Sequence, residues 1–141
     1  MEKNRKVLIV PCSGIGKPYG SVSREAAYEV TDDLRRVQTQ LVPLALLVLG
    51  DEESRAAVAE CPAISIDGCK LACAAKMVQQ SGGTLAQEIA VLDVYRRNKE
   101  LKPQGIAELN KGGLKLAHVL AEEVSAVVDG ILAGEKGGKH A

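Results

Sequence analysis

Residues 63–73 read AISIDGCKLAC and contain a clear strand-turn-helix pattern. Residues 63–67 are a short β-branched run that ends at an Asp-Gly pair, which is typical of a buried strand followed by a turn. The apolar spacing of residues 70–80 then predicts a helix, which Gly82 and Gly83 bring to an end. A strand, a turn and a helix in this order are the building unit of parallel α/β sheets.

The same alternation continues on both sides of this stretch. The predicted strands are residues 6–10, the first half of 39–49, 63–67 and 88–95. The predicted helices are residues 21–36, 51–60, 70–80 and 114–132. Pro43 indicates that the second strand lies at a sheet edge or ends early, and Ser21 or Ser23 could cap the first helix. Four strands that alternate with helices predict an α/β fold, a three-layer domain with a mostly parallel sheet and helices on both faces.

The length of 141 residues suits one domain that needs no disulfide to stabilise its core. We expect residues 1–134 to form this domain. The glycine-rich and charged residues 135–141 are expected to be a disordered tail.

Composition argues against several classes of partner. Lys and Arg total 18 and Asp and Glu total 18, so no net charge attracts nucleic acid or an anionic membrane. Phe and Trp are absent, which removes the usual base-stacking side chains. The most apolar stretch, residues 41–50, is far shorter than the roughly 20 residues that span a bilayer, and the N-terminus lacks the pattern of a signal peptide. We therefore expect a cytoplasmic protein with no nucleic-acid or membrane partner, and the sequence identifies no protein partner.

The four cysteines of such a protein would stay reduced, which favours metal binding or thiol reactivity over disulfides. Cys12 follows the first predicted strand and Cys69 follows the third, so parallel strands would bring both to the same edge of the sheet. Open α/β sheets bind ligands at this edge. Cys73 follows Cys69 by four residues, and a helix that begins near Cys69 would turn both sulfurs to one face. This spacing lies within the range of zinc sites. We therefore predict that Cys12, Cys69 and Cys73 bind one metal ion.

The fourth cysteine, Cys61, precedes the strand at 63–67, whereas Cys69 follows it. An extended chain would separate these two cysteines by up to ~26 Å. Cys61 is therefore expected at the opposite edge of the sheet, as a small buried side chain.

The loop after Cys12, CSGIGKPYGS, contains three glycines, Gly14, Gly16 and Gly20. Its free N–H groups and the helix that follows could bind an anion or stabilise a Cys12 thiolate, with Lys17 and Arg24 adding positive charge. The alternative is a plain strand-to-helix turn that needs glycine for its backbone angles. Pro18 follows Lys17, so the loop is not a nucleotide-binding P-loop.

The histidines and aspartates give weaker evidence for a functional site than the cysteines do. A polar stripe of the last helix consists of Lys115, His118, Glu122, Ser125 and Asp129, so His118 is expected to face water. His140 lies in the tail, so no catalytic base is evident. Asp67 and Asp93 lie at or near strand ends and could supply an oxygen ligand. Asp67 could instead form an Asp-Gly turn and cap the next helix.

The segment IDGCKLACAAK, together with the early CSG, resembles the DGC domain family, small proteins named for an Asp-Gly-Cys motif. The resemblance runs from about residue 6 to residue 95. It implies zinc binding through four cysteines, and three of these positions correspond to Cys12, Cys69 and Cys73. The family tends to place the fourth cysteine on the second strand, but residues 38–50 contain none. The fourth ligand is left open between water, Asp67, Asp93 and Cys61.

Three hypotheses for function follow. The first is a cytoplasmic zinc-binding protein with a thiolate site at the carboxyl edge of the sheet. The second is a thiol enzyme or redox sensor that uses Cys12 with Cys69 or Cys73. The third is an interaction module in which the helix at 114–132 docks a partner. Catalytic residues, and whether the protein is an enzyme, are left open.

Overall fold

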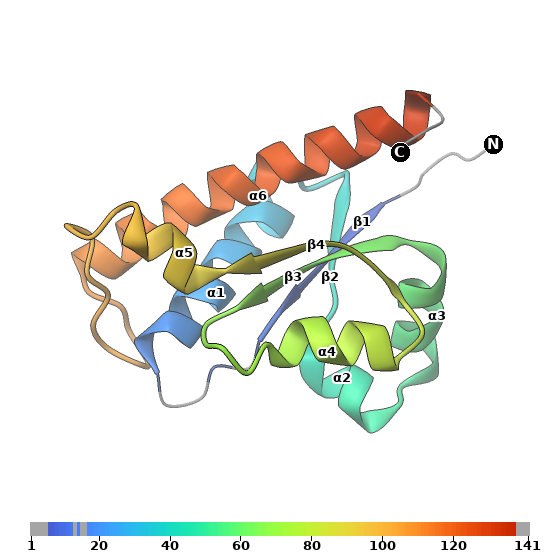
Figure 1. Cartoon of the computed structure of the whole chain (residues 1–141), viewed down its shortest axis with the longest axis horizontal. Coiled ribbons are helices and arrows are strands. Elements are labelled where there is room, and N and C mark those ends of the chain that lie inside the picture. The colour runs from blue at the N-terminus through green and yellow to red at the C-terminus, as the bar shows by residue number, and fades with distance from the viewer. Residues whose placement is uncertain (1–5, 13, 15–16, 138–141) are drawn as a thin grey trace.

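The computed structural model describes residues 6–12, 14 and 17–137 of the 141-residue chain. The strands are β1 (Val7–Pro11), β2 (Thr39–Leu41), β3 (Pro62–Asp67) and β4 (Thr84–Ala90). The helices are α1 (Pro18–Glu29), the π-helical turn η1 (Val30–Leu34), α2 (Leu44–Leu49), α3 (Glu52–Glu60), α4 (Cys73–Gln80), α5 (Val91–Arg96) and α6 (Lys111–Gly137). All strand pairs are parallel, in the order β2-β1-β3-β4 (Figure 1). The predicted α/β fold is confirmed.

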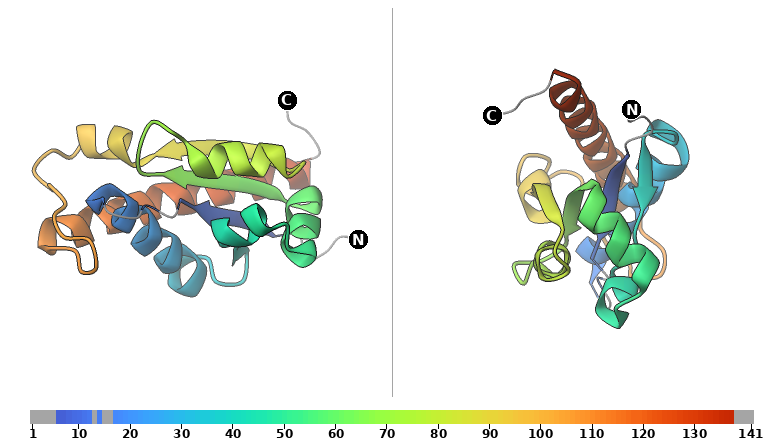
Figure 2. Two further views of the ribbon diagram at one scale, coloured as in Figure 1. Left: turned by 90° about the horizontal axis from the view of Figure 1, so that it is seen from below. Right: turned by 90° about the vertical axis from the view of Figure 1, so that its right-hand side faces the viewer.

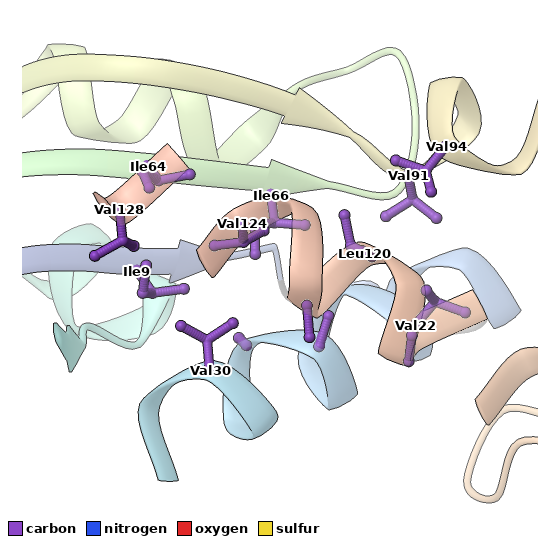
Figure 3. Close-up of a cluster of buried hydrophobic side chains, with 14 of the residues drawn as sticks. Ile9, Val22, Val30, Ile64, Ile66, Val91, Val94, Leu120, Val124 and Val128 are labelled. Atoms are coloured by element: carbon purple, nitrogen blue, oxygen red, sulfur yellow. The ribbon is translucent and has the colours of Figure 1, made fainter. Parts of the chain in front are cut away.

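Two apolar cores cover the two faces of the sheet, because successive side chains of a strand point to opposite sides. Val7 and Ile9 of β1 belong to the core under α1, α5 and α6, part of which Figure 3 shows. Leu8 and Val10 belong to the core under α2, α3 and α4. Figures 1 and 2 show α6 on one side of the sheet and α4 on the other. The predicted three-layer arrangement, with helices on both faces, is thus observed.

Helix α1 begins three residues earlier than predicted, and neither proposed serine caps it. Pro18 is its first residue, a position where the missing N–H of proline costs nothing. Lys17 precedes it in extended conformation. Ser21 and Ser23 lie buried inside the helix, so the prediction of a serine cap was wrong.

Two boundaries next to the carboxyl edge of the sheet also differ from the prediction. Helix α4 begins at Cys73, because Ala72 before it is in the left-handed conformation (φ 53°). The predicted strand 88–95 is a strand only as far as Ala90, which pairs with Asp67 at the end of β3. Beyond that pair β3 offers no partner, and the chain turns into α5. Asp93 therefore lies on a helix.

The edge strand β2 ends before Pro43, as predicted. Helix α6 is longer than predicted at both ends and runs to Gly137, so residues 135–137 of the expected tail are helical. The rest of that tail, residues 138–141, lies outside the described residues. His118 has about half of its side chain exposed, as expected, whereas Ser125 of the same predicted polar stripe is buried. Among the described helices, none combines the length and the apolar character needed to cross a membrane.

Candidate thiolate site at the carboxyl edge of the sheet

The candidate site lies where the strand order reverses. The chain runs from β1 to β2 on one side and then crosses to β3 on the other side of β1. The crevice beyond the carboxyl ends of β1 and β3 is therefore a topological switch point, the usual ligand position in open parallel sheets. Cys12 directly follows β1, and its backbone N–H donates to the carbonyl of Ile66 at 2.9 Å. Gly68 directly follows β3.

The side chain of Cys12 is buried and hydrogen-bonded. Only 7% of the residue is exposed. The backbone N–H of Gly68 donates to Cys12 Sγ at 3.3 Å, and Ser23 Oγ lies 3.3 Å from the same sulfur. Ser23 Oγ donates its single proton to the carbonyl of Gly20 at 2.7 Å, so the Cys12 S–H is the donor toward Ser23. The sulfur of Cys12 is thus held between α1 and the turn after β3.

The backbones of three glycines near this thiol pack closely against one another. A Cβ added at Gly20 would lie 2.2 Å from the Cα of Gly14, and one added at Gly68 would lie 2.8 Å from the nitrogen of Gly20. Real Cβ atoms do not approach other atoms so closely, so glycine is needed here for close packing. Gly14 also has a positive φ of 58°. For Gly14 and Gly20, the structure supports the interpretation of this loop as a strand-to-helix turn that needs glycine. Gly16 lies outside the described residues.

Asp67 fixes the start of α4. Its buried carboxylate accepts hydrogen bonds from the backbone N–H groups of Ala74 at 2.8 Å and Ala75 at 3.2 Å. These are donors of the first helical turn that have no partner within the helix. Burial raises the pKa of the Asp67 carboxyl above its usual value, and the two backbone hydrogen bonds oppose that shift. The predicted capping role of Asp67 is therefore confirmed.

The two remaining predicted ligands lie on the turn that links β3 to α4. Cys69 is half-buried, and Cys73 is exposed at the first position of the helix. The N–H of Ala72 donates to the carbonyl of Cys69 at 3.2 Å, so Cys69 belongs to a turn outside the helix. The argument that both sulfurs share one helical face was therefore wrong. In the part of the chain that the structure describes, no three His, Cys, Asp or Glu side chains are grouped to hold a metal ion. The assignment of Cys12, Cys69 and Cys73 to one metal stays a prediction.

Cys61 lies at the other end of β3. It caps the carboxyl end of α3 and packs, half-buried, against the core under α2, α3 and α4. The whole of β3 separates it from Cys69. The predicted separation of these two cysteines is confirmed.

Asp93 shares a pocket with the Asp-Gly-Cys turn. The pocket has a volume of about 240 Å³ at the carboxyl ends of β3 and β4, and its lining includes Asp67, Cys69 and Asp93. Lys70 and Arg96 add positive charge, and Arg96 donates to Asp93 at 2.8 Å. Of the two candidate carboxylates, Asp93 lies in an exposed ion pair with Arg96, whereas both oxygens of Asp67 accept backbone N–H groups.

Two features of the site were missed in the sequence. Ser23 contacts the Cys12 sulfur, and nothing in the sequence distinguishes it from the other serine of α1. The contact between Gly20 and Gly68 had a signal, because each glycine flanks a loop next to a predicted cysteine ligand.

Comparison with known proteins gives one match. Searches of the curated proteins and of the solved structures found no match to the chain. A family model described as the DGC domain matches residues 8–112, which is well over half of the chain and extends from β1 to the start of α6. The matched segment contains Cys12, the Asp67-Gly68 turn and the cysteines that follow it. The chain therefore belongs to the DGC domain family.

Proposed function

We propose that this protein binds a zinc ion through the thiolates of Cys12, Cys69 and Cys73. The observation that carries the proposal is the hydrogen bond from the Gly68 N–H to Cys12 Sγ. It brings the first cysteine, 56 residues away in sequence, against the residue next to Cys69. Thiolate sulfurs about 2.3 Å from the metal are the usual ligands of structural zinc sites.

Three thiolates are a donor set that suits zinc. For all three to reach one ion, the turn at residues 68–72 must move toward Cys12. Cys69 lies in that turn and Cys73 directly follows it, and both are less buried than Cys12, which leaves their sulfurs accessible to a metal. With Asp67 engaged as a helix cap and Cys61 beyond β3, Asp93 or water is the better fourth ligand. A closed site of four protein ligands would be structural or regulatory, and a bound water would supply Lewis-acid chemistry.

The test is the metal content of protein purified without a metal-affinity tag, measured for single Cys→Ser variants. Cys12→Ser, Cys69→Ser and Cys73→Ser should each lower zinc below one ion per chain. Cys61→Ser is the matched control and should leave zinc unchanged. Metal binding contributes folding free energy, so removal of zinc by a chelator should also lower the melting temperature of the unmodified chain.

Two results would contradict the proposal. One is that the purified chain contains no zinc and that its melting temperature changes neither with a chelator nor with added zinc. The other is loss of zinc in Cys61→Ser as complete as in Cys69→Ser, which would require a different ligand set.

A second candidate function is thiol redox chemistry, favoured by the hydrogen bond that brings Cys12 against Gly68, the residue next to Cys69. Peroxide would oxidise Cys12 and Cys69 to a disulfide, so that two thiols lose two electrons and two protons and peroxide is reduced to water. Peptide mapping after brief peroxide treatment should then find this disulfide, and a reductant should reverse it. Reduced thiols at all four positions would exclude this candidate.

The interaction hypothesis is not needed to explain the apolar side of α6, because that side packs on α1 and on the sheet within the same domain (Figure 3). The proposed zinc and thiol functions both need reduced cysteines, which agrees with the four free thiols. We therefore propose a cytoplasmic location as well.

A further inference from the structure

The strand β4 forms one edge of the sheet and is open to solvent (Figure 1). The central strands β1 and β3 are buried throughout, whereas no residue of β4 is buried. An edge strand carries a row of backbone N–H and C=O groups that have no partner in the sheet. Among the described residues, no backbone hydrogen bond reaches β4 from outside the sheet. A further strand can therefore pair with β4.

The available part of β4 is its second half, residues 87–90. The register of β4 against β3 shifts between Ala63 and Ile64, which leaves Ala86 of β4 without a partner. Such a bulge twists an edge and protects it from pairing with other chains. Residues 87–90 pair regularly with β3, and they contain neither the proline nor the lysine that commonly blocks an edge. This half of the strand is therefore open to a partner.

The two faces of this half-strand differ in chemistry. Ile89 pairs with Ile66 of β3 and packs against the core under α1, α5 and α6. Glu88 is the preceding residue, so its side chain points to the opposite face, where α4 lies. Glu88 is exposed, and among the described residues it has no ion-pair partner. An uncompensated negative charge therefore lies on the α4 face of the open edge.

A pocket on the other face lies beside residues 87–90. It has a volume of about 340 Å³ and is formed by β4, α5 and α6. All four consecutive residues of β4 line it, which places it along the edge of the strand. Its apolar lining comes from Ile89, Val94, Ala126 and Val127.

The charged groups of this pocket are balanced. Both terminal nitrogens of Arg97 donate to Glu123, at 2.7 and 3.2 Å, and Asp93 is paired with Arg96. An uncharged side chain therefore suits the pocket better than a charged one. At roughly 30 Å³ per water-sized group, the volume holds about eleven non-hydrogen atoms, which is enough for an aromatic side chain.

We propose that β4 binds an extended segment of a partner protein, which adds a strand to the sheet. An aromatic side chain of that segment fills the pocket, and a lysine or arginine lies beside Glu88. Successive side chains of an extended chain point to opposite faces, so adjacent residues of one segment meet both requirements. Strand addition of this kind is a common mode of peptide recognition. The proposal does not depend on zinc.

A second copy of this chain is the poorer occupant of the edge. The sequence of β4, TLAQEIA, contains neither a basic nor an aromatic side chain. An antiparallel pair of β4 strands would also place the two Glu88 side chains on the same face of the joined sheet, where like charges repel. The chemistry of the edge therefore favours a different protein.

The test uses the synthetic peptide acetyl-Thr-Lys-Phe-Lys-Thr-amide, in which Phe and the two Lys side chains point to opposite faces when the chain is extended. The peptide is titrated into the full chain while backbone amide resonances are followed by NMR. The amides of Gln87, Glu88 and Ile89 should shift to saturation. A peptide with Glu in place of both Lys should bind about tenfold more weakly, because like charges then meet Glu88.

A methylated peptide tests the backbone pairing. Methyl groups are placed on two consecutive backbone nitrogens, those of Phe and of the Lys that follows it. Consecutive N–H groups point to opposite edges of an extended peptide, so either edge is then blocked. This peptide should not shift the amides of residues 87–90, and binding as tight as that of the unmethylated peptide would overturn the proposal.

Three variants show whether the contacts are the proposed ones. Glu88→Gln should weaken binding of the Lys peptide about threefold and reduce its advantage over the Glu peptide. Glu53→Gln, which neutralises an exposed glutamate of α3, is the matched control and should bind both peptides as the parent does. Ala126→Leu fills the pocket from an exposed position of α6. It should weaken the Phe peptide to the affinity of a peptide with Ala in place of Phe.

Two further results would overturn the proposal. One is equal binding of the Lys and Glu peptides by the parent chain, and the other is equal binding of the Lys peptide by Glu88→Gln and Glu53→Gln. Sedimentation of the parent chain without peptide tests for a second copy at this edge. A monomer is expected, whereas a dimer that shields the amides of residues 87–90 from the peptide would contradict the assignment to a different protein.

Discussion

Gly20 and Gly68 pack backbone against backbone, so the first turn of α1 rests directly on the turn that follows β3. A Cβ at Gly68 would lie 2.8 Å from the nitrogen of Gly20 and 2.9 Å from the carbonyl carbon of Tyr19. This contact holds Cys12 between the two segments. The Cys12 sulfur accepts a hydrogen bond from the Gly68 N–H on one side and lies beside Ser23 of α1 on the other.

The first prediction is that Gly68→Ala destabilises the protein by about 1–3 kcal/mol, the usual cost of forcing atoms into a packed region. The added methyl group must push α1 away from the turn, because its neighbours are backbone atoms that cannot rotate aside. Urea denaturation measures the change. Gly130→Ala on α6 is the control, since a Cβ there meets nothing within 4 Å, and it should stabilise the helix by up to about 1 kcal/mol. A Gly68→Ala variant as stable as the parent would mean that the contact is loose.

The second prediction concerns the cap of α4. Asp67→Ala leaves the N–H groups of Ala74 and Ala75 without their partner and should cost about 2 kcal/mol. Asp67→Asn keeps one oxygen acceptor and removes a buried charge, so it should cost about 1 kcal/mol or less. Urea denaturation near neutral pH compares the two. If Asn destabilises as much as Ala, the negative charge itself is required.

The third prediction is that Ala72→Gly stabilises the protein slightly. Ala72 is in the left-handed conformation, which costs a non-glycine residue roughly 1 kcal/mol, and glycine is favoured just before a helix. The greater freedom of glycine in the unfolded chain offsets part of this gain, so about 0.5 kcal/mol should remain. In contrast, Ala56→Gly at an exposed position inside α3 should destabilise by about 1 kcal/mol. Equal losses in both variants would refute the strain at Ala72.

The fourth prediction is a dependence of stability on pH. His118 of α6 contacts Glu29 of α1, and this hydrogen bond, with the charge of Glu29, raises the pKa of His118 above its usual value. A histidine pKa that is higher in the folded state stabilises fully below the unfolded value of about 6.5. The stabilisation is lost as the pH rises through the folded pKa. For such an exposed pair it should amount to roughly 0.2–1 kcal/mol.

His118→Gln tests this by urea denaturation at about pH 6 and about pH 9. The parent should exceed the variant in stability at the lower pH, and the difference should shrink at the higher pH. Glu29→Gln should remove most of this pH dependence, which links the effect to the contact between α1 and α6, and the remainder comes from Glu122, which lies 3.3 Å from the other ring nitrogen of His118. A difference that is constant with pH would show that the imidazole acts by packing alone.

The order and type of most elements could be predicted because each has a local signal. β1 is a continuous apolar run, β3 is mostly apolar up to Asp67, and both are fully buried in a parallel sheet. The start of α4 could not be predicted, since its cap, Asp67, lies seven residues before the first N–H that it accepts. The end of β4 depends on the length of β3, its partner, and nothing in residues 88–95 shows that length.

The candidate site divides in the same way. Parallel strands predict that Cys12 and the Asp-Gly-Cys turn lie at the same edge of the sheet. In the structure the two are in contact, because the Gly68 N–H donates a hydrogen bond to the Cys12 sulfur. The relation between Cys69 and Cys73 depended on where a helix begins, and there the prediction of a shared helical face was wrong. Ser23 could not be found, because only the packing of α1 on β1 brings it to the sulfur.

The position of β3 between Cys61 and Cys69 makes this pair of thiols a reporter of unfolding. A disulfide needs the two Cα atoms within about 7 Å, whereas a six-residue strand extends about 20 Å. A bond between Cys61 and Cys69 can therefore form only in molecules that have lost β3. Its rate of formation in a mild oxidant would measure how often the centre of this sheet opens, and the crosslinked chain could not return to the native fold.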